Sequence, residues 1–259
     1  MRTQWNENGE TQKVISPVSL IISAFASIAD VRGTLTPQLN NTDDTTLVLV
    51  QLGEGKRRMA GSILGQVLNQ AGDQVPDLDD AQDLVKLVNA VNTLRAQGKI
   101  LAYHDRSDGG LMAAVCEMAF AGQVGVALNV DMLVTEGDGI ADSRMDVGDS
   151  KNWAAQVSVR RDELTLQALF NEELGAVVQI RRADRSRVLD ALDAAGLAKL
   201  CCVIGSAGSG DRLVIRAAGK TVLDESRIDL HRAWSETTSR AGCARPQPWQ
   251  SLSASACGI

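Results

Sequence analysis

Two spacings of apolar residues alternate along the chain, one typical of strands and the other of helices. Short apolar runs bounded by glycine or polar residues predict strands, and apolar residues at i, i+3, i+4 and i+7 predict helices. The predicted strands cover 47–53, 99–104, 124–130, 175–180 and 200–205, and a hairpin over 210–226 turns at Ala218–Gly219. The predicted helices cover about 59–71, 81–97, 111–121, 164–173 and 185–195, and a last one starts near Glu225. Asp79 or Asp80 is expected to cap the helix over 81–97, and Gly98 to end it.

This alternation of strands and helices predicts an α/β fold, a mixed sheet with flanking helices. Residues 47–240 form the predicted α/β domain, and residues 1–46 form a lead-in segment with an apolar patch at 18–29. Residues 133–162 are acidic, contain glycine and have no clear period, which predicts an inserted loop. Residues 241–259 have no regular period, so we expect an irregular tail, either disordered or an artefact of truncation or of a shifted reading frame.

Composition limits the possible classes of function. Only 3% of the 259 residues are aromatic, so the core must be aliphatic, and base-stacking surfaces for single-stranded nucleic acid are not expected. The formal net charge of −6 also disfavours binding to a phosphate backbone. No apolar run reaches 18 residues, and the polar N-terminal segment lacks a signal core. We therefore expect a soluble cytoplasmic protein.

The cysteines indicate a reducing environment. Their number is odd and no CxxC motif is present, so neither a disulfide framework nor a zinc site is favoured. Cys201 and Cys202 are neighbours in a predicted strand and should point to opposite faces of the sheet. A metal site or redox pair stays open, but buried small apolar side chains are the favoured interpretation.

The stretch "HDRSDGGL" at 104–111 connects a predicted strand to a predicted helix. The first amides of a helix lack partners within the helix and carry partial positive charge, so they can bind an anion. Ser107 or Asp108 can cap the helix, which places Gly109 and Gly110 in its first turn. Two glycines there weaken the helix, which suggests that a ligand such as phosphate needs close access to the backbone.

Aspartates beside a phosphate could also hold Mg²⁺, which takes carboxylate and phosphate oxygens together. The alternative is an ordinary connection, since Asp, Ser and Gly are common where a strand leads into a helix. The stretch is neither a P-loop nor a dinucleotide-binding fingerprint. On the residues alone the ordinary connection is favoured, and His104 fits a hydrogen-bonded strand end better than a general base.

Three other polar segments have candidate functions, each with a simpler alternative that we favour. The four arginines of 181–187 could attract an anionic ribonucleotide, but they fit a solvated first helical turn capped by Asp184. The stretch 205–212 resembles a phosphate loop but connects two strands. The paired carboxylates of "NEELG" at 171–175 could act as acid and base, although a packing role is favoured.

Several longer motifs together resemble one family of enzymes. They are "LAYHDRSDGGL" followed by "EMAFAG", "LFNEELGAV", "SPVSLIISAFA", "VRGTLTPQL" and "SGDRLVI". These motifs closely resemble the phosphoribosylformylglycinamidine synthase family, over about residues 1–240 with an interruption at 133–162. Aminoimidazole ribonucleotide synthetase and selenophosphate synthetase, from the same superfamily, fit "LFNEELGAV" and "YHDRSDGGL" less well.

The resemblance implies a fold like the C-terminal domain of aminoimidazole ribonucleotide synthetase. It also implies a part in an ATP- and glutamine-dependent ligase of purine biosynthesis, which converts formylglycinamide ribonucleotide to formylglycinamidine ribonucleotide. Asp105 matches the family's Mg²⁺ ligand, and Ser107 matches a serine that contacts nucleotide. Together with the amides near Gly109 and Gly110, they would belong to an auxiliary site that holds ADP without turnover.

The resemblance covers only the C-terminal lobe of the second synthetase half, so a fragment is expected. The family's Gly-rich ATP segment, other Mg²⁺ ligands and first synthetase half would precede Met1, and the glutaminase domain would follow residue 240. The expected partners are therefore the remaining lobes of the same ligase, and the lobe alone should be inactive. The alternative, of a different class, is a non-catalytic interaction module or an inactive remnant of that enzyme.

Overall fold

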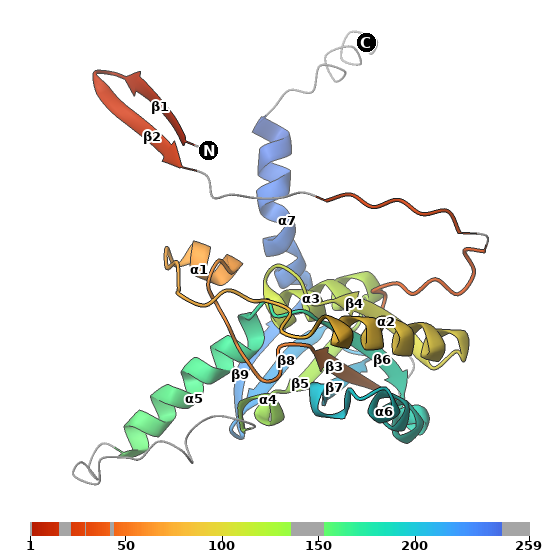
Figure 1. The fold of residues 1–259 in the computed structure, drawn as a ribbon. Helices are drawn as coiled ribbons and strands as arrows, with labels where there is room; N and C mark the ends of the chain where they lie inside the picture. Colours follow the sequence, from red (N-terminus) through yellow and green to blue (C-terminus); the bar gives the residue numbers. More distant parts are fainter. Residues whose placement is uncertain (1, 16–21, 29, 42–43, 136–152, 245–259) are drawn as a thin grey trace, which may run out of the picture. The chain divides into compact units, whose positions relative to one another are not determined.

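The computed structural model describes residues 2–15, 22–28, 30–41, 44–135 and 153–244 (Figure 1). The chain divides into two compact units, residues 1–34 and residues 35–259. The predicted apolar patch at 18–29 lies partly outside the described residues, as does most of the predicted tail.

The first unit contains an antiparallel hairpin of strands β1 (Arg2–Glu7) and β2 (Glu10–Ile15). Asn8 and Gly9 connect the strands with φ values of 52° and 85°, as a two-residue hairpin turn requires. The pattern of apolar residues does not predict this hairpin, because its strands are largely polar. The Asn-Gly pair is the sequence signal that could have found it.

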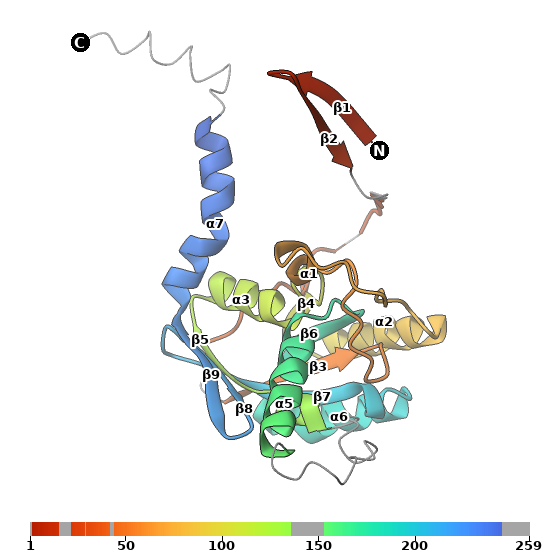
Figure 2. The ribbon, with the colours of Figure 1, turned by 90° about the vertical axis from the view of Figure 1, so that its left-hand side faces the viewer.

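The second unit is built around a seven-stranded mixed sheet, which confirms the predicted α/β fold class (Figures 1 and 2). The strand order is β4-β6-β3-β7-β5-β8-β9, in which β5 and β8 are parallel and the other neighbours are antiparallel. The strands are β3 (Thr45–Gln51), β4 (Ile100–Asp105), β5 (Gly125–Asn129), β6 (Gly175–Arg181), β7 (Cys201–Gly208), β8 (Arg212–Ala217) and β9 (Lys220–Ser226).

Helices cover both faces of this sheet. Side chains of α2 and α6 pack in one apolar cluster, and side chains of α3, α4 and α5 pack in another on the opposite face. The helices are α1 (Ile63–Val67), α2 (Ala81–Ala96), α3 (Gly110–Gly122), α4 (Asp131–Thr135), α5 (Trp153–Phe170), α6 (Arg185–Ala194) and α7 (Arg227–Ala244), with 3₁₀ turns at Arg182–Asp184 and Ala198–Leu200.

Burial on both faces explains the continuous apolar run of the central strand β3. Leu47 and Leu49 pack on the α3–α5 side, and Val48 lies in the α2–α6 cluster. The same alternation places Cys201 in the α2–α6 cluster and Cys202 in the other. The prediction that these two cysteines face opposite sides of the sheet is therefore confirmed.

Several local predictions are confirmed in detail. Asp80 caps α2, because its side chain accepts a hydrogen bond from the backbone N–H of Gln82. Gly98 follows that helix with a φ of 64°, and Ala218 and Gly219 form the turn between β8 and β9.

Other boundaries are wrong. The predicted loop at 133–162 includes the end of α4 and the first half of α5, and the predicted helix at 59–71 is reduced to α1. Burial is described for residues 160–170 of α5, and there Leu164, Ala168 and Leu169 are buried at helical spacing. This is the part of the helix that the sequence period predicts. Helix α7 continues through Ala244, beyond the predicted start of the tail.

Part of the predicted lead-in belongs to the second unit. Leu39 is buried in the α3–α5 cluster, and the Thr36 carbonyl accepts a hydrogen bond from the Tyr103 N–H. The Gln179 side chain accepts from the Asn40 N–H and donates to the Asn40 carbonyl. Within the described residues, no helix has the length and apolarity needed to cross a membrane.

Candidate functional site

The polar turn lies at the edge of the sheet, between the end of β4 and the start of α3. The Arg106 N–H donates to the Gly175 carbonyl at 2.8 Å, which continues the pairing of β4 with β6. The Gly110 N–H donates to the Ser107 carbonyl at 2.9 Å and closes the turn. The side chains of Asp105 and Ser107 are exposed, whereas Arg106 between them is buried.

Packing accounts for both glycines of the turn. Gly109 and Gly110 have φ values of 80° and 66°, in the left-handed region that favours glycine. A Cβ atom at Gly110 would lie 2.6 Å from the carbonyl oxygen of Asn171, so the end of α5 also requires glycine there. The two glycines therefore do not by themselves indicate a ligand.

The predicted helix cap is wrong. Gly109 is the N-cap residue of α3, and it has no side chain with which to accept a hydrogen bond. The carboxylate of Glu172 takes that role: its Oε1 atom accepts from the Gly109 N–H and from the Ile63 N–H, both at 2.8 Å. Neither Ser107 nor Asp108 caps the helix, and the amides of Gly109 and Gly110 already have acceptors.

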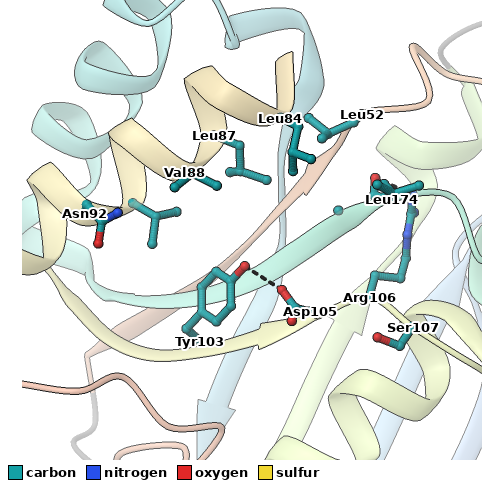
Figure 3. Close-up of a pocket in the computed structure, with 12 residues that line it drawn as sticks. Leu52, Leu84, Leu87, Val88, Asn92, Tyr103, Asp105, Arg106, Ser107 and Leu174 are labelled. Atoms are coloured by element: carbon teal, nitrogen blue, oxygen red, sulfur yellow. Dashed lines mark hydrogen bonds between the residues drawn. The ribbon is translucent and has the colours of Figure 1, made fainter. Parts of the chain in front are cut away.

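A cavity of about 440 Å³ opens beside the turn (Figure 3). One wall is apolar and comes from α2, where Leu84 and Val88 are 38% and 50% exposed. The opposite wall carries Tyr103, Asp105 and Ser107 with part of Arg106. The sequence gives no sign of this wall of α2, because Leu84 and Val88 fit the same helical period as the buried residues.

Asp105 stands at the polar side of this cavity with one oxygen engaged. Its Oδ1 atom accepts a hydrogen bond of 2.6 Å from the Tyr103 hydroxyl, drawn as a dashed line in Figure 3. Burial, and then the hydrogen bond to Asp105, raise the pKa of Tyr103, so this hydroxyl stays a donor at neutral pH. Within the described part of the chain, no hydrogen bond reaches Oδ2.

A complete metal site is not present among the described residues, where no three His, Cys, Asp or Glu side chains gather suitably. Asp105 can provide one carboxylate, which fits Mg²⁺ because this ion commonly takes one or two carboxylates and completes its shell with phosphate oxygens and water. A Mg²⁺ ion at this place would need the phosphates of a nucleotide.

His104 is hydrogen-bonded at both ring nitrogens, as expected of a residue at a strand end. Nδ1 lies 2.6 Å from the Asp105 carbonyl oxygen, and Nε2 lies 2.9 Å from Glu117 Oε2. The other oxygen of Glu117 accepts from the Trp234 indole N–H at 3.1 Å, which links α3 to α7. Phe120 also stacks on His231 of α7, with ring centroids 4.6 Å apart.

A second cavity, of about 580 Å³, shares no lining residue with the first. It is lined by Lys56, Arg57 and Lys199, which would suit an anion. Two of these cations are already engaged, since Lys56 pairs with Asp79 at 2.9 Å and Arg57 donates to the Leu133 carbonyl. The turn beside the first cavity is therefore the better candidate site.

Comparison with known proteins agrees with this architecture. A family model described as the C-terminal domain of AIR synthase related proteins matches residues 47–218, more than half of the chain. The chain belongs to this family. The resemblance seen in the motifs is therefore confirmed as far as the AIR synthase-related family.

Three solved structures from Thermotoga maritima share the AIR synthase-related fold. PurL complexed with ATP matches with a TM-score of 0.52 and 14% identity, over 76% of this chain and 27% of its own. PurL complexed with FGAR matches with a TM-score of 0.53 and 15% identity, over 76% and 29%. A phosphoribosylformylglycinamidine synthase II matches with a TM-score of 0.50 and 14% identity, over 75% and 27%.

At these identities the likeness concerns the fold, and this chain spans little more than a quarter of the length of each structure. Within the fold, the remaining segments singled out in the sequence take structural places. The stretch 205–212 leads from β7 into β8. Asp184 precedes α6, but its carboxylate accepts from Lys99 at 2.7 Å instead of capping the helix.

The "NEELG" segment contributes more to the site than its sequence suggests. Glu172 holds the start of α3, as described above, and the neighbouring Glu173 is fully buried against Arg58. Sequence reasoning missed Arg106, Glu172 and Glu173 as neighbours of the site. Their partners lie 63 to 115 positions away, so no local pattern could have found them.

Proposed function

We propose that this chain is part of the ATP- and glutamine-dependent ligase that converts formylglycinamide ribonucleotide to formylglycinamidine ribonucleotide. Membership of the AIR synthase-related family supports a ligase-type enzyme. The shared fold with structures complexed with ATP and with FGAR, and the motifs around 101–111 and 169–177, support this particular reaction. In the cytoplasm, where purine synthesis would take place, the expected partners are the other synthetase lobes and the glutaminase domain.

Within that enzyme, the role proposed for this lobe is to form one wall of a Mg-nucleotide site. The observation that carries the proposal is the cavity of about 440 Å³, with an apolar wall on α2 and Asp105 and Ser107 on the polar side. Base and sugar would pack on the apolar wall. The phosphates would lie on the polar side, where the Ser107 hydroxyl can donate a hydrogen bond.

Mg²⁺ would be held by Asp105 through the oxygen that Tyr103 does not occupy. When bound, the ion neutralises charge on the phosphate oxygens. The chain's own contribution is to present the carboxylate in a fixed direction, because the hydroxyl of Tyr103, two residues earlier in β4, donates a hydrogen bond to it.

The proposed nucleotide contacts of Gly109 and Gly110 carry a condition. Since Glu172 occupies the Gly109 amide and the Ser107 carbonyl occupies the Gly110 amide, a phosphate at this turn must displace the carboxylate or contact the turn elsewhere. In the undisplaced state, Asp105 and Ser107 are the polar side chains that the turn presents to the cavity, and Asn92 faces it from α2.

Exposed apolar side chains support the proposed association with other lobes. Val67 at the end of α1 and the following Leu68 are 76% and 56% exposed, and Val85 on α2 is 51% exposed. Exposed apolar surface of this kind is typical of faces that another protein surface covers.

The second candidate is a non-catalytic interaction module or an inactive remnant of the ligase. The exposed apolar side chains of Val67, Leu68 and Val85 favour this alternative as much as the first, since an interaction module also needs an apolar face. It predicts apolar exposure without nucleotide binding, so a direct binding measurement separates the two candidates.

The test is calorimetric titration of MgADP and MgATP into the full chain. We expect Mg-dependent binding that Asp105→Asn weakens by about tenfold or more, since one direct ligand is lost. Asp190→Asn removes an exposed carboxylate from α6 and should leave binding unchanged. Equal affinity with and without Mg²⁺, and in Asp105→Asn, would contradict the metal role. Absence of binding would favour the interaction module.

In the assembled ligase, Asp105→Ala should reduce retention of Mg-nucleotide more than the rate of the chemical step, because the matched site is the auxiliary one. Nucleotide content after gel filtration, compared with the rate of product formation, measures the two effects separately. Unchanged retention would contradict the auxiliary role.

A further inference from the structure

Arg106 differs from its two neighbours in the turn. Asp105 and Ser107 are exposed at the cavity, whereas Arg106 is only 4% exposed. Its side chain runs from the turn toward Leu174 instead of outward (Figure 3). Burial of an arginine costs free energy unless its charge is paired or hydrogen-bonded, so the contacts of Arg106 need an account.

Three hydrogen bonds from Arg106 reach three successive carbonyls of the neighbouring segment. The backbone N–H donates to Gly175 at 2.8 Å, Nε donates to Glu173 at 2.5 Å, and Nη2 donates to Leu174 at 3.4 Å. Arg106 thus joins the turn to the segment that leads into β6 through hydrogen bonds from both its backbone and its side chain.

That segment is itself fixed by the Glu173 carboxylate, which is fully buried. Arg58 donates to this carboxylate from its backbone N–H at 3.0 Å, from Nε at 2.7 Å and from Nη2 at 2.8 Å. The carboxylate also packs on Gly53, where a Cβ atom would lie 2.9 Å from Oε2. The carbonyl groups that accept hydrogen bonds from Arg106 therefore belong to a segment that is itself held in place by Arg58.

Arg106 also brings a charge beneath the site. Burial lowers the pKa of Arg106 to about 10, which still leaves the side chain protonated at neutral pH. Its Nη1 atom is buried and has no hydrogen-bond acceptor among the described residues. The site thus rests on a fixed cation, which favours a phosphate-bearing ligand over an uncharged one.

We propose that Arg106 is the positioning residue of the site, holding Asp105 and Ser107 at the cavity and selecting ligands that carry phosphate. The selection of ligands rests on the proposed function, whereas the positioning of the turn does not. Arg58 and Glu173 serve this role indirectly, by fixing the carbonyls that Arg106 binds.

The test compares Arg106→Gln and Arg106→Lys with Arg212→Gln in the full chain. Arg212 is an exposed arginine paired with Asp224 in the β8–β9 hairpin, so it controls for loss of an arginine away from the site. Calorimetry measures the dissociation constants of MgADP and of adenosine, and amide hydrogen exchange measures the protection of residues 105–109.

We expect Arg106→Gln to weaken MgADP binding by about tenfold while adenosine binding changes less than about twofold, since adenosine has no phosphate. Arg106→Lys keeps the charge but cannot reach all the carbonyls, so it should recover part of the MgADP affinity and still speed exchange at 105–109. Arg212→Gln should change neither measurement.

Equal losses for MgADP and adenosine would overturn the selection of phosphate, because they would show a general structural defect. Unchanged exchange at 105–109 in Arg106→Lys would overturn the positioning role, and this variant can be measured even if Arg106→Gln does not fold. If the unchanged chain binds no MgADP, the proposed function fails, and faster exchange in Arg106→Lys would still support the positioning of the turn.

Discussion

The two ends of the antiparallel pair β4–β6 carry the same kinds of residue in different surroundings. At the end near the candidate site, the Glu173 carboxylate is fully buried and its partner Arg58 is 13% exposed. At the opposite end, Asp184 pairs with Lys99, and their side chains are 12% and 23% exposed. Each end also has a glycine with positive φ, Gly110 at the first and Gly98 at the second.

The difference lies in what surrounds each group. At the first end, charges and glycine are enclosed by backbone from distant parts of the chain, so little can move without loss of contacts. At the second end, the cations that pair with Asp184 are partly exposed, Lys99 at 23% and Arg181 at 53%, and open space surrounds the glycine. The ion pairs and glycines at the two ends should therefore contribute unequally to the free energy of unfolding. Matched substitutions at the two ends can measure this difference.

The largest expected effect comes from Glu173→Gln. Loss of this charge weakens three hydrogen bonds from Arg58, which keeps only Asp79 as an ionic partner among the described residues, and removes the carboxylate that favours the charge of the buried Arg106. It should lower the free energy of unfolding by about 3–5 kcal/mol. The matched variant Asp184→Asn should cost clearly less, because the two cations that pair with Asp184, Lys99 and Arg181, are partly exposed and can be solvated after the change. Urea unfolding followed by circular dichroism gives both values, and equal losses would show that the two ends do not differ.

The second prediction uses the two glycines. Gly110→Ala combines a strained φ with a clash of 2.6 Å against the Asn171 carbonyl oxygen, and should cost about 3 kcal/mol. At Gly98, nothing lies within 4 Å of an added Cβ, so Gly98→Ala should cost about 1 kcal/mol from φ alone. Thermal unfolding of both variants checks the ratio, and a cost at Gly98 as large as that at Gly110 would argue against the role of enclosure.

The smallest effect is a dependence on pH at the more exposed end. The hydrogen bond from Lys99 holds the pKa of Asp184 below its ordinary value of 3.8. Its stabilising contribution is therefore complete above that value and is lost as the pH falls through the lowered pKa of the folded state. The difference in unfolding free energy between the unchanged chain and Asp184→Asn should shrink between about pH 5 and pH 3.

Urea midpoints at the two pH values test this prediction. Asp190→Asn provides the reference, because Asp190 is an exposed carboxylate of α6 that forms no ion pair with another described residue. A difference for Asp184→Asn that stays constant with pH would mean that its contact with Lys99 does not favour the ionised form.

Local chemistry made much of the fold predictable from sequence. The apolar run of β3, the cap at Asp80 and the turn at Ala218–Gly219 each depend on residues within a few positions of one another, so their pattern carries the necessary information. Helix α5 was only partly predicted because its clear apolar period is confined to its last turns. The first half of α5, which falls within the predicted loop, shows no clear apolar period and so was not predicted as a helix.

The candidate site was less predictable than the fold. Asp105 and Ser107 were selected through a resemblance, and the structure places both at the cavity beside α2. The hydrogen bonds that shape the turn join Glu172 to Gly109 and Arg106 to Glu173, and the ion pair behind them joins Arg58 to Glu173. Such partners become neighbours only after the sheet has formed, so neither spacing nor composition reveals them.

Because side chains alternate along β7, its two consecutive cysteines can report separately on the two faces of the sheet. Cys201 packs in the α2–α6 layer and Cys202 in the layer of α3–α5, although they are consecutive in sequence. Both side chains are partly buried and reach the second cavity, and burial raises the pKa of Cys201, which keeps its reactive thiolate scarce. A substitution that loosens one layer should therefore speed modification of the cysteine in that layer more than that of its neighbour, so one strand can show which side of the sheet loosens first.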